Sequence, residues 1–184
     1  MIETMASCRG TQFFSTLHLA LALWLMMETV AETAVAGPVD NTAASHDRAG
    51  HFATQHLPHL HKDAEQGSPL AQYLLGALYQ HGEIVPQDHA EALKWFRRAA
   101  DQGLAIAQFA LGEMYARGQG VPEDIVRAHM WLNLSVERSA QMAGAQKLTR
   151  DAQEIRDALA RKMTPAQLEE AEYLARKWKP KPER

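Results

Sequence analysis

The feature that most constrains this chain is an internal repeat with a period of 36 residues. Residues 66–95 and residues 102–131 carry the same residue at thirteen equivalent positions, whereas ordinary residue frequencies would give about two matches by chance. A fixed period of this length is typical of stacked helical repeats and not of a compact enzyme core. The matching pairs are Gln66/Gln102, Gly67/Gly103, Ala71/Ala107, Gln72/Gln108, Leu75/Leu111, Gly76/Gly112, Tyr79/Tyr115, Gly82/Gly118, Val85/Val121, Pro86/Pro122, Asp88/Asp124, Ala92/Ala128 and Trp95/Trp131.

Each copy is predicted to form two helices joined by a turn. In the first copy Gly67 can end the preceding helix in a left-handed conformation, Ser68 can cap the next helix, and Pro69 suits its first position. This first helix is expected to end near Gly82, and Asp88 is expected to cap the second helix. Its apolar face falls at helical spacing on Ala92, Leu93, Trp95, Phe96 and Ala99.

A glycine recurs inside the first helix of each copy, as Gly76 and Gly112. Glycine in a helix costs about 1 kcal/mol relative to alanine, so its recurrence predicts that a ring or another backbone lies against it. One helix pair cannot bury such a face alone, and the copies must therefore stack.

The repeated pattern is Ala-Gln-x-x-Leu-Gly-x-x-Tyr, then Gly, Val-Pro, Asp, Ala and Trp. It resembles the Sel1-like repeat, a relative of the tetratricopeptide repeat, in the copies Ala71–Ala100 and Ala107–Val136. The resemblance implies an all-α fold, a short right-handed α-solenoid whose concave face binds other proteins or peptides. It implies no catalytic residue and no cofactor.

The first 36 residues have the three parts of a secretory signal peptide. Arg9 lies near the start, the apolar run Phe13–Met27 follows, and Ala34–Ala36 forms a small-x-small cleavage site. Cleavage after Ala36 would remove the only cysteine, Cys8, and deliver the chain to the periplasm or the exterior with no stable membrane span. An uncleaved anchor is the alternative, and Met5 is an alternative start.

A linker over residues 37–50 precedes a region rich in histidine. Imidazoles commonly bind zinc, copper or nickel, so a metal site is one interpretation. The spacing argues against it, because only His56 and His59 lie three apart and Pro58 separates them. A solvated helix surface is favoured, and no metal is expected. The histidines are His46, His51, His56, His59 and His61.

The repeats are predicted to lie between atypical capping helices. Residues 51–66 look like a degenerate second helix, because Leu57, Leu60 and Ala64 align with apolar residues 36 positions later. The repeats themselves are assigned to residues 67–102 and 103–138, and the C-terminal cap to residues 139–178.

The cap is predicted to contain two helices and a tail. An apolar face predicts a long helix over residues 140–162, comprising Met142, Ala145, Leu148, Ala152, Ile155 and Leu159. Thr164 to Gln167 is a capping-box start, with proline at the first helical position. The last helix presents Leu168, Ala171, Leu174, Ala175 and Trp178. The basic tail, residues 179–184, is expected to be frayed and solvated, with contact to an anionic surface as the alternative.

The sequence contains no catalytic or phosphate-binding motif, and its net charge of -3 argues against a general nucleic-acid binder. Unlike residues on the first helices of the copies are the better candidates for recognition, since the repeated ones build the scaffold. The partner-binding candidates are Tyr73, Ala77, Gln80, His81, Phe109, Glu113, Ala116 and Arg117.

The favoured function is an exported, non-catalytic adaptor in the bacterial envelope that binds a protein or peptide of unknown identity. Drift on a solvent-exposed face is an equal explanation for the unlike residues. An envelope enzyme or binder acting on cell-wall material is the second hypothesis, and a histidine-based metal binder is the third. The oligomeric state is not indicated by the sequence.

Overall fold

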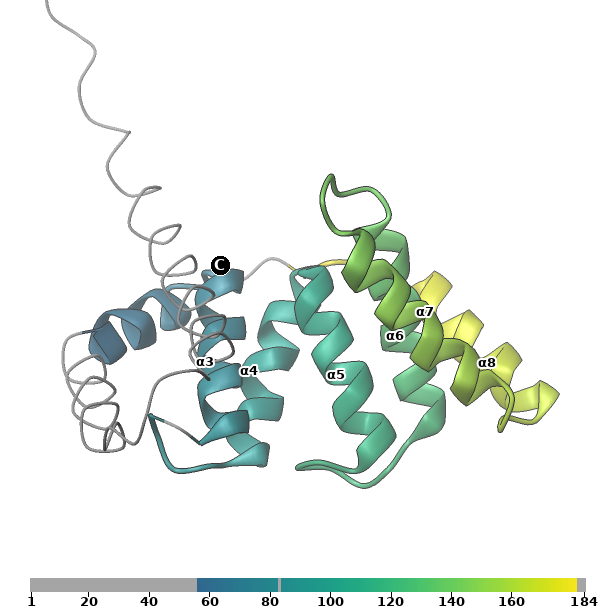
Figure 1. Cartoon of the computed structure of the whole chain (residues 1–184), viewed down its shortest axis with the longest axis horizontal. Helices are drawn as coiled ribbons and strands as arrows, with labels where there is room; N and C mark the ends of the chain where they lie inside the picture. Colours follow the sequence, from purple (N-terminus) through teal and green to yellow (C-terminus); the bar gives the residue numbers. More distant parts are fainter. Residues whose placement is uncertain (1–55, 83, 182–184) are drawn as a thin grey trace, which may run out of the picture. The chain divides into compact units, whose positions relative to one another are not determined.

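Helices packed in succession make up the part of the chain that the computed structural model describes, residues 56–82 and 84–181 (Figure 1). These residues contain no strand, and the fold is an all-α helical repeat. A first helix spans residues 56–65. It is followed by α3 (Pro69–His81), α4 (His89–Asp101), α5 (Ala105–Arg117), α6 (Ile125–Ser139), α7 (Gln146–Ala160) and α8 (Pro165–Lys177).

The predicted caps define where the helices begin. Ser68 caps α3 by accepting from the Ala71 amide, and Asp88 caps α4 by accepting from two amides of its first turn. Thr164 and Gln167 form the complete capping box of α8. These side chains satisfy amides that a helix start leaves without partners.

The connection inside each repeat is closed by the same backbone bond. The amide of Asp88 donates to the carbonyl of Tyr79 at 2.9 Å, and that of Asp124 donates to the carbonyl of Tyr115 at 3.0 Å. Gly82 and its counterpart Gly118 end the first helices with positive φ angles of 75° and 65°. The repeated residues therefore reproduce one turn geometry twice.

The prediction of a close approach at the helical glycines is confirmed. A Cβ atom placed on Gly76 would lie 2.7 Å from the Phe96 ring. On Gly112 it would lie 2.6 Å from the Leu132 side chain and 3.3 Å from a backbone oxygen. In both repeats the second helix thus approaches the first where a side chain is missing.

Buried glutamines join successive units. Gln72 donates to the carbonyl of Ala64 at 3.0 Å, and Gln108 donates to the carbonyl of Ala100 at 3.3 Å. Gln102 donates to the side-chain oxygen of Gln72 at 2.8 Å. The helix over residues 56–65 is therefore joined to α3 by the same glutamine hydrogen bond that joins α4 to α5.

The C-terminal cap differs from its prediction at its start. The helix predicted over residues 140–162 is shorter: α6 ends at Ser139, and α7 spans Gln146–Ala160. Gly144, with a φ of 85°, lies in the intervening connection, and this conformation cannot continue a right-handed helix. Met142, predicted on an apolar helix face, is 53% exposed in the connection.

The basic tail is not frayed as far as it is described. After α8 the Trp178 ring packs edge-on against Trp131 at 6.2 Å, with the Arg138 guanidinium 5.3 Å from its centre. The amide of Lys181 then donates to the carbonyl of Asp101 at 2.7 Å. The segment after α8 thus runs back to the end of α4 (Figure 1), because aromatic packing and a backbone bond hold it there.

Replacing Gly76 with alanine is expected to destabilise the protein. The added methyl group must displace the Phe96 ring, and overpacking costs about 1–3 kcal/mol, against a gain of about 1 kcal/mol in helix propensity. Urea denaturation followed by circular dichroism measures the change in unfolding free energy. Phe96→Leu should offset part of the loss in the double variant; equal stability of Gly76→Ala and the parent chain would contradict the close approach.

Replacing Gln72 with leucine is expected to lower the free energy of unfolding by about 1–3 kcal/mol, because it removes the hydrogen bonds of the buried Gln72 amide with Ala64 and Gln102. Gln87→Leu is the matched control, since the Gln87 amide also donates to a backbone carbonyl but is exposed. The control should change stability by less than about 0.5 kcal/mol. Equal losses in the two variants would show that burial of the amide does not matter.

Candidate functional site

The eight predicted partner-binding residues lie on two helices, four on α3 and four on α5. None of the eight is buried; six are half-buried, and His81 and Arg117 are exposed. We call this set the α3–α5 surface: Tyr73, Ala77, Gln80, His81, Phe109, Glu113, Ala116 and Arg117.

Tyr73 of α3 and Glu113 of α5 lie close enough on this surface to interact electrostatically. Burial raises the pKa of the Tyr73 hydroxyl, and the nearby Glu113 carboxylate raises it further. The Tyr73 ring also packs against Phe96, with ring centres 5.6 Å apart. Tyr73 therefore stays neutral at physiological pH and presents a hydroxyl beside an acidic group.

Glu113 is also paired along its own helix. The Arg117 guanidinium lies 2.8 Å from the Glu113 carboxylate, one helical turn away. The structure thus brings Tyr73, Glu113 and Arg117 into one polar group. Ala77, Phe109 and Ala116 pack at the edge of the apolar core and supply the neighbouring apolar area.

The end of α3 is placed differently. The backbone carbonyl of Gln80 accepts a hydrogen bond from the Gln87 side-chain amide at 2.9 Å. His81 lies exposed in the last turn of α3. These interactions belong to the connection between α3 and α4. The described contacts therefore do not join Gln80 and His81 to the group around Glu113.

Arg150 is a candidate recognition residue that the repeat pattern of the sequence does not predict. It is the fifth residue of α7, as Tyr73 is of α3 and Phe109 is of α5. The period of 36 residues cannot identify this equivalence, because the connection before α7 is longer than those between the repeats. The signal available in the sequence was Gly144, which can end a helical segment.

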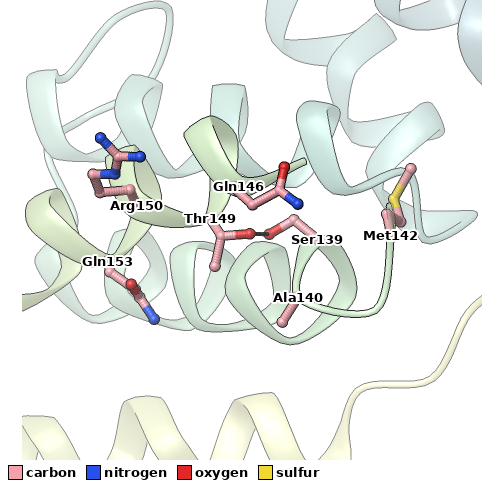
Figure 2. Close-up of a pocket in the computed structure, with 7 residues that line it drawn as sticks. All are labelled: Ser139, Ala140, Met142, Gln146, Thr149, Arg150 and Gln153. Atoms are coloured by element: carbon pink, nitrogen blue, oxygen red, sulfur yellow. Dashed lines mark hydrogen bonds between the residues drawn. The ribbon is translucent and has the colours of Figure 1, made fainter. Parts of the chain in front are cut away.

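Arg150 lines a cleft of about 390 Å³ between the end of α6 and α7. Figure 2 shows the bond from the Thr149 hydroxyl to the Ser139 hydroxyl, 2.8 Å long, with Arg150 and Met142 on opposite sides of it. The lining offers hydroxyl, amide and guanidinium groups for hydrogen bonding. Its residues are Ser139, Ala140, Met142, Gln146, Thr149, Arg150 and Gln153.

Within the described residues, no group of three or more histidine, cysteine, aspartate and glutamate side chains is placed to hold a metal ion. His61 instead packs edge-on against Tyr79 and Trp95, with ring centres 6.4 Å and 6.2 Å away. His46 and His51 lie outside the described residues.

The predicted signal peptide also falls outside the part of the chain that is described. Of the helices that are described, none has the length and apolar character needed to cross a membrane.

Comparison with known proteins identifies the repeats. The Sel1 repeat family matches residues 69–104 and 105–139, and these segments begin at the first residues of α3 and α5. The predicted repeats began two residues earlier, since they were bounded by the glycines at residues 67 and 103. A comparison with curated proteins finds no match.

Two solved structures are similar. The crystal structure of c5321, a protective antigen present in uropathogenic Escherichia coli strains displaying an SLR fold, is 28% identical with a TM-score of 0.56, over 72% of this chain and 29% of its own. A Sel1 repeat protein from Oxalobacter formigenes is 47% identical with a TM-score of 0.44, over 50% of this chain and 26% of its own. This chain thus spans less than a third of the length of either protein. The chain thus carries two Sel1 repeats on an all-α helical repeat fold.

Proposed function

We propose that this protein is a non-catalytic interaction module that binds a peptide or a partner protein through the α3–α5 surface. Sel1 repeat proteins generally mediate protein–protein interactions, and the family is typically non-catalytic. The observation that carries the assignment is the group formed by Tyr73, Glu113 and Arg117. It combines an aromatic ring, a hydroxyl and two opposite charges on residues that differ between the two repeats.

The composition of the surface suits recognition of a peptide. Tyrosine and arginine are enriched among the residues that carry binding energy at interfaces. Phe109, Ala77 and Ala116 add half-buried apolar area beside them. A partner segment with an apolar side chain and a polar or charged neighbour would complement both parts.

The proposal also covers where in the cell the protein acts. We infer that the chain is exported, because its first 36 residues combine an apolar run with a small-x-small cleavage site. The similarity to c5321 of Escherichia coli supports the bacterial envelope as the location. The hypotheses of a cell-wall enzyme and of a metal binder have no comparable support among the described residues.

The test is a pair of substitutions on the α3–α5 surface of the full chain. Tyr73→Ala combined with Phe109→Ala is expected to reduce capture of the partner from an envelope fraction at least tenfold, which corresponds to about 1.4 kcal/mol. Quantitative mass spectrometry of the captured proteins measures the loss. Tyr173→Ala is the matched control, because it removes an exposed aromatic ring from α8.

A second variant guards against unfolding of the first. Exchanging the charges, Glu113→Arg with Arg117→Glu, keeps an ion pair along α5 but reverses its order on the surface. Its helical signal should match the parent chain while capture falls. Unchanged capture by both variants would show that the partner binds elsewhere.

A further inference from the structure

A second cleft lies between α6, α7 and α8, away from the α3–α5 surface. Its volume is about 380 Å³, within the range of small-molecule sites. Polar and charged side chains dominate its lining. The residues are His129, Asn133 and Glu137 of α6, Arg156 and Ala160 of α7, and Leu168, Glu172 and Arg176 of α8.

The repeat scaffold does not require this polar lining. His129 lies 36 residues after Leu93, which packs against the main apolar core. Only 5% of His129 is exposed. Burying an imidazole where leucine fits costs free energy unless its nitrogens are hydrogen-bonded, so packing alone does not account for histidine here.

The His129 imidazole is neutral, and one of its nitrogens lacks a hydrogen-bond partner among the described residues. Burial lowers its pKa and the Arg156 charge lowers it further, while Glu172 and Asp157 oppose the shift. Its Nδ1 atom is buried with no hydrogen-bond partner in the described part of the chain. A buried polar atom without a partner costs free energy, and a ligand that forms a hydrogen bond with this imidazole would recover part of that cost.

Arg156 supplies positive charge beside the imidazole. Its side chain is only 23% exposed. The guanidinium donates to Asn133 Oδ1 at 3.3 Å and, through Nε and Nη2, to Asp157 Oδ1 at 3.0 Å and 2.8 Å. Three of its five N–H groups are thereby used, and two remain as donors. The inner part of the cleft is therefore suited to a carboxylate.

The rim carries an ion pair and a further carboxylate. Glu172 lies 3.4 Å from Arg176, and both side chains are largely solvated. Glu137 accepts from the Asn133 amide at 3.4 Å. These carboxylates favour an ammonium group at the entrance, and Leu168 adds an apolar wall.

We propose that the cleft between α6, α7 and α8 binds a free α-amino acid with a short aliphatic side chain. The carboxylate meets Arg156 and His129, and the ammonium group meets Glu172. The cleft is separate from the α3–α5 surface, so this proposal does not depend on the proposed function.

Calorimetric titration of the full chain with L-alanine, acetate and ethylamine tests the assignment. L-alanine should bind saturably in the millimolar range or tighter, acetate more weakly, and ethylamine not at all. The NMR resonance of the His129 ring should move with L-alanine. No heat and no shift at millimolar L-alanine would overturn the proposal, as would acetate binding as tightly as L-alanine.

Substitutions assign the two ends of the ligand. Arg156→Gln should weaken L-alanine binding at least tenfold, whereas Arg150→Gln, on the same helix but lining the other cleft, should not. Glu172 is exposed, so Glu172→Gln leaves the core intact. This variant should weaken the binding of L-alanine without weakening the binding of acetate. Equal affinities in the parent chain and the Arg156 and Glu172 variants would refute the site.

The role of His129 in binding is tested by replacing it with leucine, which the first repeat carries at the equivalent position. His129→Leu should leave the free energy of unfolding equal or higher, because it removes a buried unpaired polar atom, yet weaken L-alanine binding about tenfold. Unchanged binding would remove His129 from the site.

The pH dependence gives an independent readout. A bound carboxylate favours the protonated imidazole and raises the pKa of His129. The affinity of the parent chain should therefore increase as the pH falls through the ordinary histidine value of 6.5, and the affinity of His129→Leu should not.

Discussion

The stacking of this protein depends on a buried side-chain amide that reaches into the preceding helix. Gln72 and Gln108 each donate to a carbonyl in the last turn of the helix before them, at Ala64 and Ala100. Carbonyls at a helix end have no partner within the helix. Each of these carbonyls also accepts from the amide of the glycine that follows the helix, Gly67 or Gly103. The glutamine adds a second donor, and this donor comes from the next unit and orients the two units relative to each other.

The glutamine hydrogen bonds between units are not fully repeated toward the C-terminus, and the packing of the helices changes there. Arg138 lies 36 residues after Gln102, and the oxygen of Gln108 is buried without a partner in the described structure. Thr149 on α7 bonds to Ser139 instead. The array therefore ends in a different packing, in which α8 lies mainly on α6 and Trp178 contacts Trp131. Both clefts described above adjoin this irregular end.

The sequence predicted what repetition and local chemistry determine. The all-α repeat fold, the caps at Ser68, Asp88 and Thr164, and the close approach at Gly76 all follow from residue types whose effects act over a few positions or recur at the period. The start of α7 and the equivalence of Arg150 were not predicted, because one connection of altered length ends the period. The cleft around His129 was not predicted either, since packing of α8 on α6 joins segments that no pattern in the chain relates. Whether the α3–α5 surface binds a partner stays a prediction.

The return of the chain from α8 to Asp101 changes how such an array can unfold. In a linear repeat protein each unit touches only its neighbours, so the units at the end can detach while the others stay folded. Here the Lys181 amide is bonded to the end of α4, and Trp178 lies against α6. Detaching the C-terminal helices must break contacts with both repeats, so partial unfolding from this end is penalised. Unfolding of the two repeats and the C-terminal helices is thereby expected to be more cooperative than unfolding of a linear repeat array.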